Sequence, residues 1–202
     1  MSTSKNVMTV GHAVPSFEME TYDPSEASFG KFSLDAMKTQ GKWTVLFFYP
    51  ADFTFVCPTE LADLADRHAA LRELNIEVVS VSTDTKYAHL AWRNSEKLLQ
   101  NVEYAMAADP TGTVSRLFGV YDETTGLALR GTFIIDPDGK LVSSEVNYYN
   151  LGRDVAELQR KVEAFVYLRD HPDEACPAKW KHGNKTLTPS EKLVGQVYDA
   201  LQ

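Results

Sequence analysis

The chain has 202 residues, of which 44% are hydrophobic, and it carries a formal net charge of −8. This length fits one domain with an additional arm, and the negative charge argues against nucleic acid or an anionic membrane as a partner. No apolar run reaches the ~18 residues of a membrane span, and residues 1–10 lack the apolar core of a signal peptide. Two cysteines do not make a disulfide scaffold, and they suit a reducing compartment. We therefore expect a cytoplasmic protein.

The first clear elements are a strand and the helix that follows it. Residues 43–49 (W-T-V-L-F-F-Y) are continuously apolar and rich in β-formers, which predicts a strand buried on both faces. Pro58 fits the first turn of a helix, where its missing N–H costs nothing. Apolar residues then recur at helical spacing, at Leu61, Leu64, Leu71 and Leu74. His68 falls on this stripe and is predicted to pack in the core.

The next elements continue the alternation of strand and helix. Residues 76–82 predict a second buried strand, and Asp84 is a plausible N-cap for a helix that reaches about Glu96. Residues 131–146 predict a β-hairpin with the turn sequence D-P-D-G at its centre. Residues 152–168 predict a helix.

This order predicts an α/β fold, a mixed sheet flanked by helices, and it fits a thioredoxin-like core over residues 1–169. Residues 171–190 are polar, contain prolines and have no periodicity, which indicates an ordered but loosely held arm. A short final helix is expected over residues 191–201. We therefore assign residues 170–202 to a C-terminal arm.

Cys57 lies where the first strand passes into its helix, and Cys176 lies in the arm. A thiol becomes a nucleophile when it ionises, and the unpaired N–H groups of a helix N-terminus favour an anion. Thr54, three residues earlier, can present its hydroxyl to the sulfur or to a bound oxygen. A sulfenic acid formed at one cysteine needs a second thiol to trap it as a disulfide, and Cys176 is the candidate for that thiol.

Other interpretations have less support. A single buried cysteine is usually an inert, small apolar residue, so the catalytic interpretation depends on the helix-start position of Cys57. The chain has no C-x-x-C pair, no metal-ligand spacing among its five scattered histidines, and no G-x-S-x-G, G-x-G-x-x-G or phosphate-binding loop. The residue types present do not exclude a Cys–His protease, but nothing in the sequence places a histidine near Cys57.

The residues around Cys57 are similar to a known family. The pattern P-x-x-x-T-x-x-C, formed by Pro50, Thr54 and Cys57, matches the active-site motif of peroxiredoxins. Residues 47–61 (F-F-Y-P-A-D-F-T-F-V-C-P-T-E-L) resemble the alkyl hydroperoxide reductase C group within that family. Further matches are V-S-V-S-T-D-T at 79–85, D-P-T-G at 109–112, G-R-D at 152–154 and H-P-x-E-x-C-P-A-K-W-K at 171–181.

The resemblance implies a role for each matching residue. It makes Cys57 the peroxidatic cysteine and Cys176 the resolving cysteine of a typical two-cysteine peroxiredoxin. It also implies that Arg130 supplies a cation to the thiolate and that Pro50 shields the site from water.

Three further positions match the family outside the immediate site. Glu60 and Arg153 correspond to residues that orient the active-site arginine. Trp92 corresponds to an aromatic residue near the site, although simple packing explains it equally well.

The resemblance also implies an activity and partners. It implies a peroxidase that reduces hydrogen peroxide and organic hydroperoxides, with peroxynitrite as a further substrate. The Cys57 sulfenic acid would form a disulfide with Cys176 of the partner chain in a homodimer, and five dimers would form a decameric ring. A separate flavoprotein reductase, the NADH-dependent F component of alkyl hydroperoxide reductase, or a thioredoxin-type protein would reduce this disulfide. No cofactor or metal is expected in the chain.

One departure from the family affects regulation. Eukaryotic members that peroxide inactivates easily carry a G-G-L-G insertion and a C-terminal helix with Y-F, and this chain has neither. We therefore expect rapid disulfide formation and resistance to oxidation beyond the sulfenic acid.

Two alternative functions stay open. A redox-sensing chaperone or scaffold on the same fold would not turn over peroxide. A general disulfide oxidoreductase would act on protein disulfides without peroxide, but the missing C-x-x-C counts against it.

Overall fold

The computed structural model describes residues 7–202, which form two compact units. The first unit extends to Asp154, and the second comprises Val155–Gln202. Helix α5 therefore groups with the C-terminal segment that carries Cys176.

A seven-stranded mixed sheet forms the centre of the first unit, in the order β2-β1-β5-β4-β3-β8-β9. The three middle strands β5, β4 and β3 are parallel, and the remaining pairs are antiparallel. The strands are β1 Glu18–Asp23, β2 Ser28–Ser33, β3 Trp43–Phe48, β4 Ile76–Ser82, β5 Ala105–Ala108, β8 Arg130–Ile135 and β9 Leu141–Asn147. A separate pair consists of β6 Tyr121–Asp122 and β7 Leu127–Ala128.

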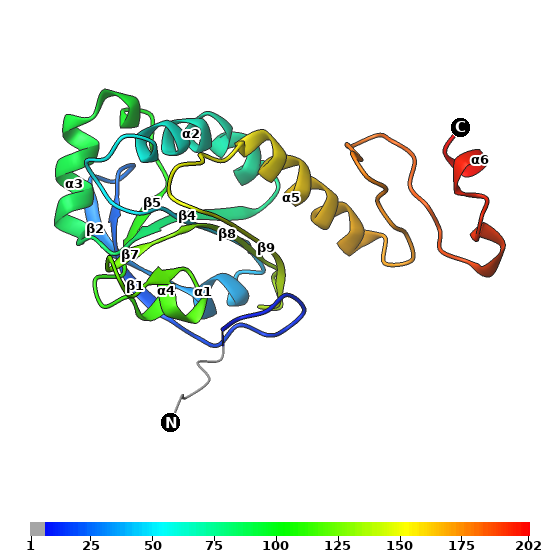
Figure 1. Cartoon of the computed structure of the whole chain (residues 1–202), viewed down its shortest axis with the longest axis horizontal. Coiled ribbons are helices and arrows are strands. Elements are labelled where there is room, and N and C mark those ends of the chain that lie inside the picture. The colour runs from blue at the N-terminus through cyan, green and yellow to red at the C-terminus, as the bar shows by residue number, and fades with distance from the viewer. Residues whose placement is uncertain (1–6) are drawn as a thin grey trace. The chain divides into compact units, whose positions relative to one another are not determined.

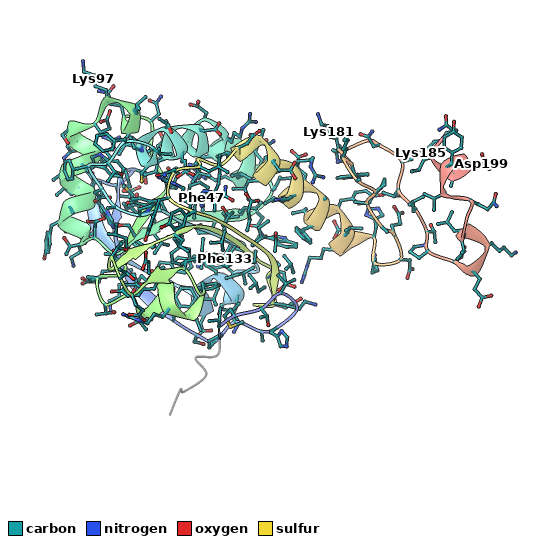
Figure 2. All side chains as sticks on the ribbon, viewed as in Figure 1. Phe47, Lys97, Phe133, Lys181, Lys185 and Asp199 are labelled. Carbon is teal, nitrogen blue, oxygen red and sulfur yellow. The ribbon has the colours of Figure 1, made fainter. Side chains whose placement is uncertain are left out.

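Helices cover both faces of this sheet. Figure 1 shows α2 on one side and α1 and α4 on the other. The helices of the first unit are α1 Leu34–Thr39, α2 Cys57–Glu73, α3 Lys86–Ser95 and α4 Thr113–Leu117, with a 3₁₀ turn at Lys97–Leu99. Figure 2 labels Phe47 and Phe133 in the interior of the unit, where each is only 1% exposed.

The buried strands follow the predicted pattern. Every residue of β3 is buried, because a central strand covered by helices on both faces needs apolar side chains throughout. Strand β4 has the predicted bounds, and the predicted hairpin forms from β8 and β9. On helix α2, Leu61, Leu64 and Leu71 of the predicted apolar stripe are buried. The predicted class, a mixed α/β sheet flanked by helices, is confirmed.

Two predicted helix starts are wrong, and one predicted helix is interrupted. Thr85, not Asp84, caps α3, because the Thr85 side chain accepts a hydrogen bond from the Ala88 N–H while Asp84 bonds elsewhere. The helix expected from residue 152 begins at Val155, since the backbone N–H of Arg153 donates to Glu60 instead. The single helix expected over 191–201 is broken.

The break in the last helix lies at Gly195. The segment forms a 3₁₀ turn at Glu191–Leu193 and a short helix α6 at Val197–Leu201. Gly195 between them has φ +78°, a left-handed conformation that ends a right-handed helix.

The second unit consists of α5, Val155–Asp170, and the segment that follows it. Residues 171–190 contain no helix or strand, but two backbone hydrogen bonds join Ala175 to Leu187, with N···O distances of 2.7 and 3.0 Å. Trp180 is buried and packs on Tyr167 with a centroid distance of 5.0 Å. The arm is therefore anchored on both sides of Cys176.

Candidate active site

Cys57 is the first residue of α2 and is completely buried. Strand β3 ends at Phe48, and the loop of residues 49–56 carries the chain from the sheet to the helix. Pro58 occupies the first turn of α2, as the sequence predicts. Because no side chain caps this helix start, the free N–H groups and the helix dipole favour negative charge there.

Arg130 reaches the sulfur from the neighbouring strand. Strand β8 runs antiparallel to β3, so its first residue lies beside the end of β3 from which the loop departs. The Arg130 Nη1 group donates to the Cys57 sulfur at 3.4 Å and to Glu60 Oε2 at 2.6 Å. Its Nε donates to the Tyr149 carbonyl at 2.8 Å. The guanidinium is thereby fixed from two sides against the thiol.

Glu60 joins two buried arginines. Arg153 donates to Glu60 Oε1 from both its backbone N–H, at 2.9 Å, and its Nε, at 2.8 Å. The Arg153 guanidinium lies 3.4 Å from the centroid of the Phe47 ring, and burial lowers its pKa against the opposing effect of Glu60. Cys57, Glu60, Arg130 and Arg153 thus form one buried cluster.

Pro50 and Thr54 lie in the loop before Cys57. Pro50 is buried, and Thr54 is half-buried. The Thr54 hydroxyl donates its hydrogen to the Ala51 carbonyl at 2.8 Å. A hydroxyl has one hydrogen and two lone pairs, so in this arrangement Thr54 Oγ1 remains available as an acceptor.

Cys176 lies in the second unit and is half-buried. Burial raises the pKa of its thiol, Glu174 adds to the increase, and Arg160 opposes it. Glu174 itself accepts hydrogen bonds from the hydroxyls of Tyr167 and Thr186. Cys176 therefore favours the protonated form, unlike a cysteine that must attack peroxide.

The remaining candidates have packing contacts. Trp92 is buried, and its ring contacts those of Tyr49 and Phe53 at centroid distances of 5.9 and 6.2 Å. His68 is half-buried rather than fully in the core, and its ring packs edge-on against Tyr104. Burial lowers the pKa of His68.

Two further kinds of feature are absent from the described part of the chain. Within residues 7–202, no cluster of three or more acidic, histidine or cysteine side chains is placed to hold a metal ion. No helix in the same range is long and apolar enough to cross a membrane.

One contact of the site could not be read from the sequence. The Tyr149 carbonyl fixes Arg130 Nε, but any residue type supplies such a carbonyl. The Tyr149 side chain is itself held, because its hydroxyl donates to Asp122 Oδ2 at 2.8 Å and lies 2.9 Å from Thr125 Oγ1.

A thioredoxin-like sheet with an arginine-bound cysteine at a buried helix start is the architecture of a peroxiredoxin. The sequence model of the AhpC/TSA family matches residues 10–144, and that of the C-terminal domain of 1-Cys peroxiredoxin matches residues 167–199. The chain belongs to the AhpC/TSA family. The resemblance predicted from the motifs around Cys57 is confirmed.

Relatives cover nearly the whole chain. Alkyl hydroperoxide reductase C of Bacillus subtilis is 50% identical over 93% of this chain and 98% of its own length. The protein of the same name from Staphylococcus epidermidis is 48% identical over 90% of this chain and 95% of its own.

Solved structures agree with the fold. The reduced 2-Cys peroxiredoxin of Plasmodium vivax superposes with a TM-score of 0.87 at 33% identity, covering 95% of this chain and 99% of that one. The AhpC of Enterococcus faecalis gives a TM-score of 0.78 at 43% identity, covering 83% and 98%.

Proposed function

We propose that this chain is a thiol peroxidase in which Cys57 reduces hydrogen peroxide and organic hydroperoxides, with peroxynitrite as a further substrate. The observation that carries the proposal is the buried Cys57 sulfur 3.4 Å from Arg130 Nη1, at the start of a helix. A cation and a helix N-terminus both favour the thiolate, which is the nucleophilic form.

In the first step the Cys57 thiolate attacks one peroxide oxygen as the O–O bond breaks. The bonding electron pair leaves with the other oxygen, which takes up a proton and departs as water or an alcohol, or departs as nitrite when peroxynitrite is the substrate. The products are a Cys57 sulfenic acid and the reduced peroxide. Arg130 and the N–H groups at the start of α2 donate to the oxygens as charge develops, while Thr54 Oγ1 accepts from the peroxide O–H.

In the second step the Cys176 thiol of a partner chain attacks the Cys57 sulfenic sulfur. A disulfide forms, and the sulfenic oxygen leaves as water. Because Cys57 is fully buried and a disulfide needs Cα atoms within about 7 Å, the first turn of α2 must unwind. We assign residues 1–169 to the peroxidase and residues 170–202 to the arm that delivers Cys176.

The disulfide then needs an external reductant. We propose a separate flavoprotein reductase that takes electrons from NADH, the F component of an alkyl hydroperoxide reductase system, or a thioredoxin-type dithiol protein. An antiparallel homodimer, and a ring of five such dimers, is the assembly that the family membership supports. We place this cycle in the cytoplasm, where free thiols persist.

The test is to treat the reduced protein with one equivalent of hydrogen peroxide and to measure its mass under denaturing, non-reducing conditions. We expect a dimer linked through Cys57 and Cys176. Cys176→Ser should consume one equivalent and stop at the sulfenic acid, and Cys57→Ser should not react. An unchanged monomer with free thiols would contradict the proposal.

A further inference from the structure

A buried polar cluster behind the active-site loop has no part in the steps above. Tyr49 and His89 are completely buried, and Asp52 is 7% exposed. Tyr49 follows β3, Asp52 belongs to the loop before Cys57, and His89 lies in the first half of α3. Buried charged groups are costly unless they are paired, so this cluster needs an explanation beyond packing.

The Asp52 carboxylate is bonded at both oxygens. Its Oδ1 accepts from the Tyr49 hydroxyl at 2.7 Å, and its Oδ2 lies 2.8 Å from His89 Nδ1. The other ring nitrogen, Nε2, lies 3.2 Å from the Ala107 carbonyl of β5. Because a carbonyl can only accept, the contact at Nε2 suits a ring N–H, and Nδ1 shares a hydrogen bond with the Asp52 carboxyl group. The loop is thereby bonded to the sheet through the imidazole.

The peptide group between Ala51 and Asp52 is bonded at both ends. Its N–H donates to Asp84 Oδ2 at 2.9 Å, and its carbonyl accepts the Thr54 hydroxyl at 2.8 Å. Asp84 Oδ2 is fixed in turn by the Ser82 hydroxyl at 2.8 Å. Because a peptide unit is planar, an anchor on its N–H also sets the direction of its carbonyl.

The backbone between these anchors is strained. Phe53 has φ +56°, a left-handed conformation that residues with a side chain rarely adopt. Such a conformation persists where the surroundings hold it in place. Phe53 lies between Asp52, which bonds to His89, and Thr54, whose hydroxyl faces the held peptide.

We propose that the Asp52–His89 pair and Asp84 position the Thr54 hydroxyl through the 51–52 peptide. With its hydrogen fixed on the Ala51 carbonyl, Thr54 Oγ1 presents its lone pairs to the O–H of the peroxide. His89, Asp52 and Asp84 are positioning residues that do not touch the substrate. This inference rests on the proposed role of Thr54 as the peroxide acceptor.

A double-mutant cycle tests the inference. We measure the second-order rate of Cys57 oxidation by hydrogen peroxide, by stopped flow, in Thr54→Val, in His89→Gln and in the double variant. We expect each single variant to be slower by roughly tenfold, as for the loss of a productive hydrogen bond. If His89 acts through Thr54, His89→Gln should have little further effect in the Thr54→Val background.

A second reaction separates positioning from loss of structure. Alkylation of Cys57 by iodoacetamide needs the thiolate but has no peroxide O–H for Thr54 to accept. We therefore expect His89→Gln to lower the peroxide rate and to leave the alkylation rate within about threefold of the wild type, allowing for context-dependent effects. His68→Gln, at a half-buried histidine of α2, is the matched control and should change neither rate.

The chemistry at Asp52 provides a rescue test. In Asp52→Asn the amide oxygen can still accept from Tyr49, and the amide N–H can donate to an unprotonated His89 Nδ1. Asp52→Asn should therefore react faster with peroxide than Asp52→Ala, which loses both bonds.

The outcomes distinguish the two proposals. A normal peroxide rate in Thr54→Val would remove Thr54 from the reaction, and this inference with it. A slow Thr54→Val combined with a fully additive effect of His89→Gln would leave the proposed function intact but overturn the inference. Equal changes in peroxide and alkylation rates would likewise assign His89 a purely structural role.

Discussion

At the scale of single residues, we expect the reactivity of Cys57 to depend on how firmly Arg130 is held. Its Nη1 bonds both Glu60 and the Cys57 sulfur, and its Nε bonds the Tyr149 carbonyl. A guanidinium fixed before the reaction stabilises the charge that develops as the O–O bond breaks, without a reorganisation cost.

We expect Arg130→Gln to slow the reaction of Cys57 with hydrogen peroxide by about 10²–10³-fold, the usual effect of removing one preorganised donor. Stopped-flow measurement of the oxidation rate tests this. Arg116→Gln, at a half-buried arginine paired with Glu123, is the control and should react normally. A near-normal rate in Arg130→Gln would remove Arg130 from the mechanism.

A substitution at Glu60 is expected to affect the stability of the fold, in contrast to the rate effect expected at Arg130. Glu60 is 2% exposed and bonds two buried guanidinium groups, so Glu60→Gln removes the carboxylate to which both are bonded. We expect a loss of about 3–5 kcal/mol in the free energy of unfolding, measured by denaturant titration of the reduced protein. Glu77→Gln, in the one-third exposed pair with Lys42, should cost under about 1 kcal/mol. Equal losses in the two variants would contradict this expectation.

The residues of the candidate site were easier to predict from the sequence than the contacts between them. The spacing of Thr54 and Cys57 before a helix indicated Cys57 as the candidate nucleophile, and the resemblance suggested Arg130. The contacts themselves join α2, β8 and the segment after β9, which lie far apart in the chain. Backbone partners such as the Ala51 and Tyr149 carbonyls leave no trace in residue type, so no pattern could predict them.

At the scale of elements, burial decided what could be predicted. Strands β3 and β4 are covered on both faces and have a continuous apolar sequence. Strand β5 (A-M-A-A) was missed because alanine has little intrinsic preference for strands; its neighbours β4 and β1 place it there. Strands β1 and β2 and the short helices α1 and α4 were missed too, since none has a long apolar period.

The N-cap of α3 is expected to contribute to the stability of the fold. Because Thr85 and not Asp84 caps the helix, Thr85→Ala should lower the free energy of unfolding by about 1 kcal/mol. Thr39→Ala, at an exposed threonine in the last turn of α1, should change it by less than about 0.5 kcal/mol. Thermal unfolding of both variants measures the difference, and an unaffected Thr85→Ala would show that the cap contributes no stability.

At the scale of the whole molecule, a compact unit that contains Cys57 is followed along the chain by a smaller unit that contains Cys176. The C-terminal end of the smaller unit contains only short helical turns, and Tyr198 of α6 is 75% exposed. A long terminal helix that would restrain unwinding of α2 has no counterpart in the described residues 171–202.

We therefore expect disulfide formation to compete well with further oxidation of Cys57. After several catalytic turnovers at low peroxide with a reducing system, intact mass should show little sulfinic acid. Cys176→Ser, which cannot form the disulfide, should accumulate sulfinic acid under the same conditions. A largely sulfinic wild-type protein would contradict this prediction.

On the proposed mechanism, the charges of the buried cluster of Glu60, Arg130 and Arg153 also couple the oxidation of Cys57 to the unwinding of α2. Within this cluster two guanidinium groups and one carboxylate leave one positive charge among buried side chains, and the Cys57 thiolate of the proposed mechanism neutralises it. A neutral sulfenic acid does not, so oxidation leaves an uncompensated buried charge, which is costly. On the proposed mechanism the reduced site is therefore electrically balanced, and we expect the oxidised site to gain by opening to solvent. We accordingly expect the electrostatics of the cluster to favour unwinding of α2 only after peroxide has been reduced.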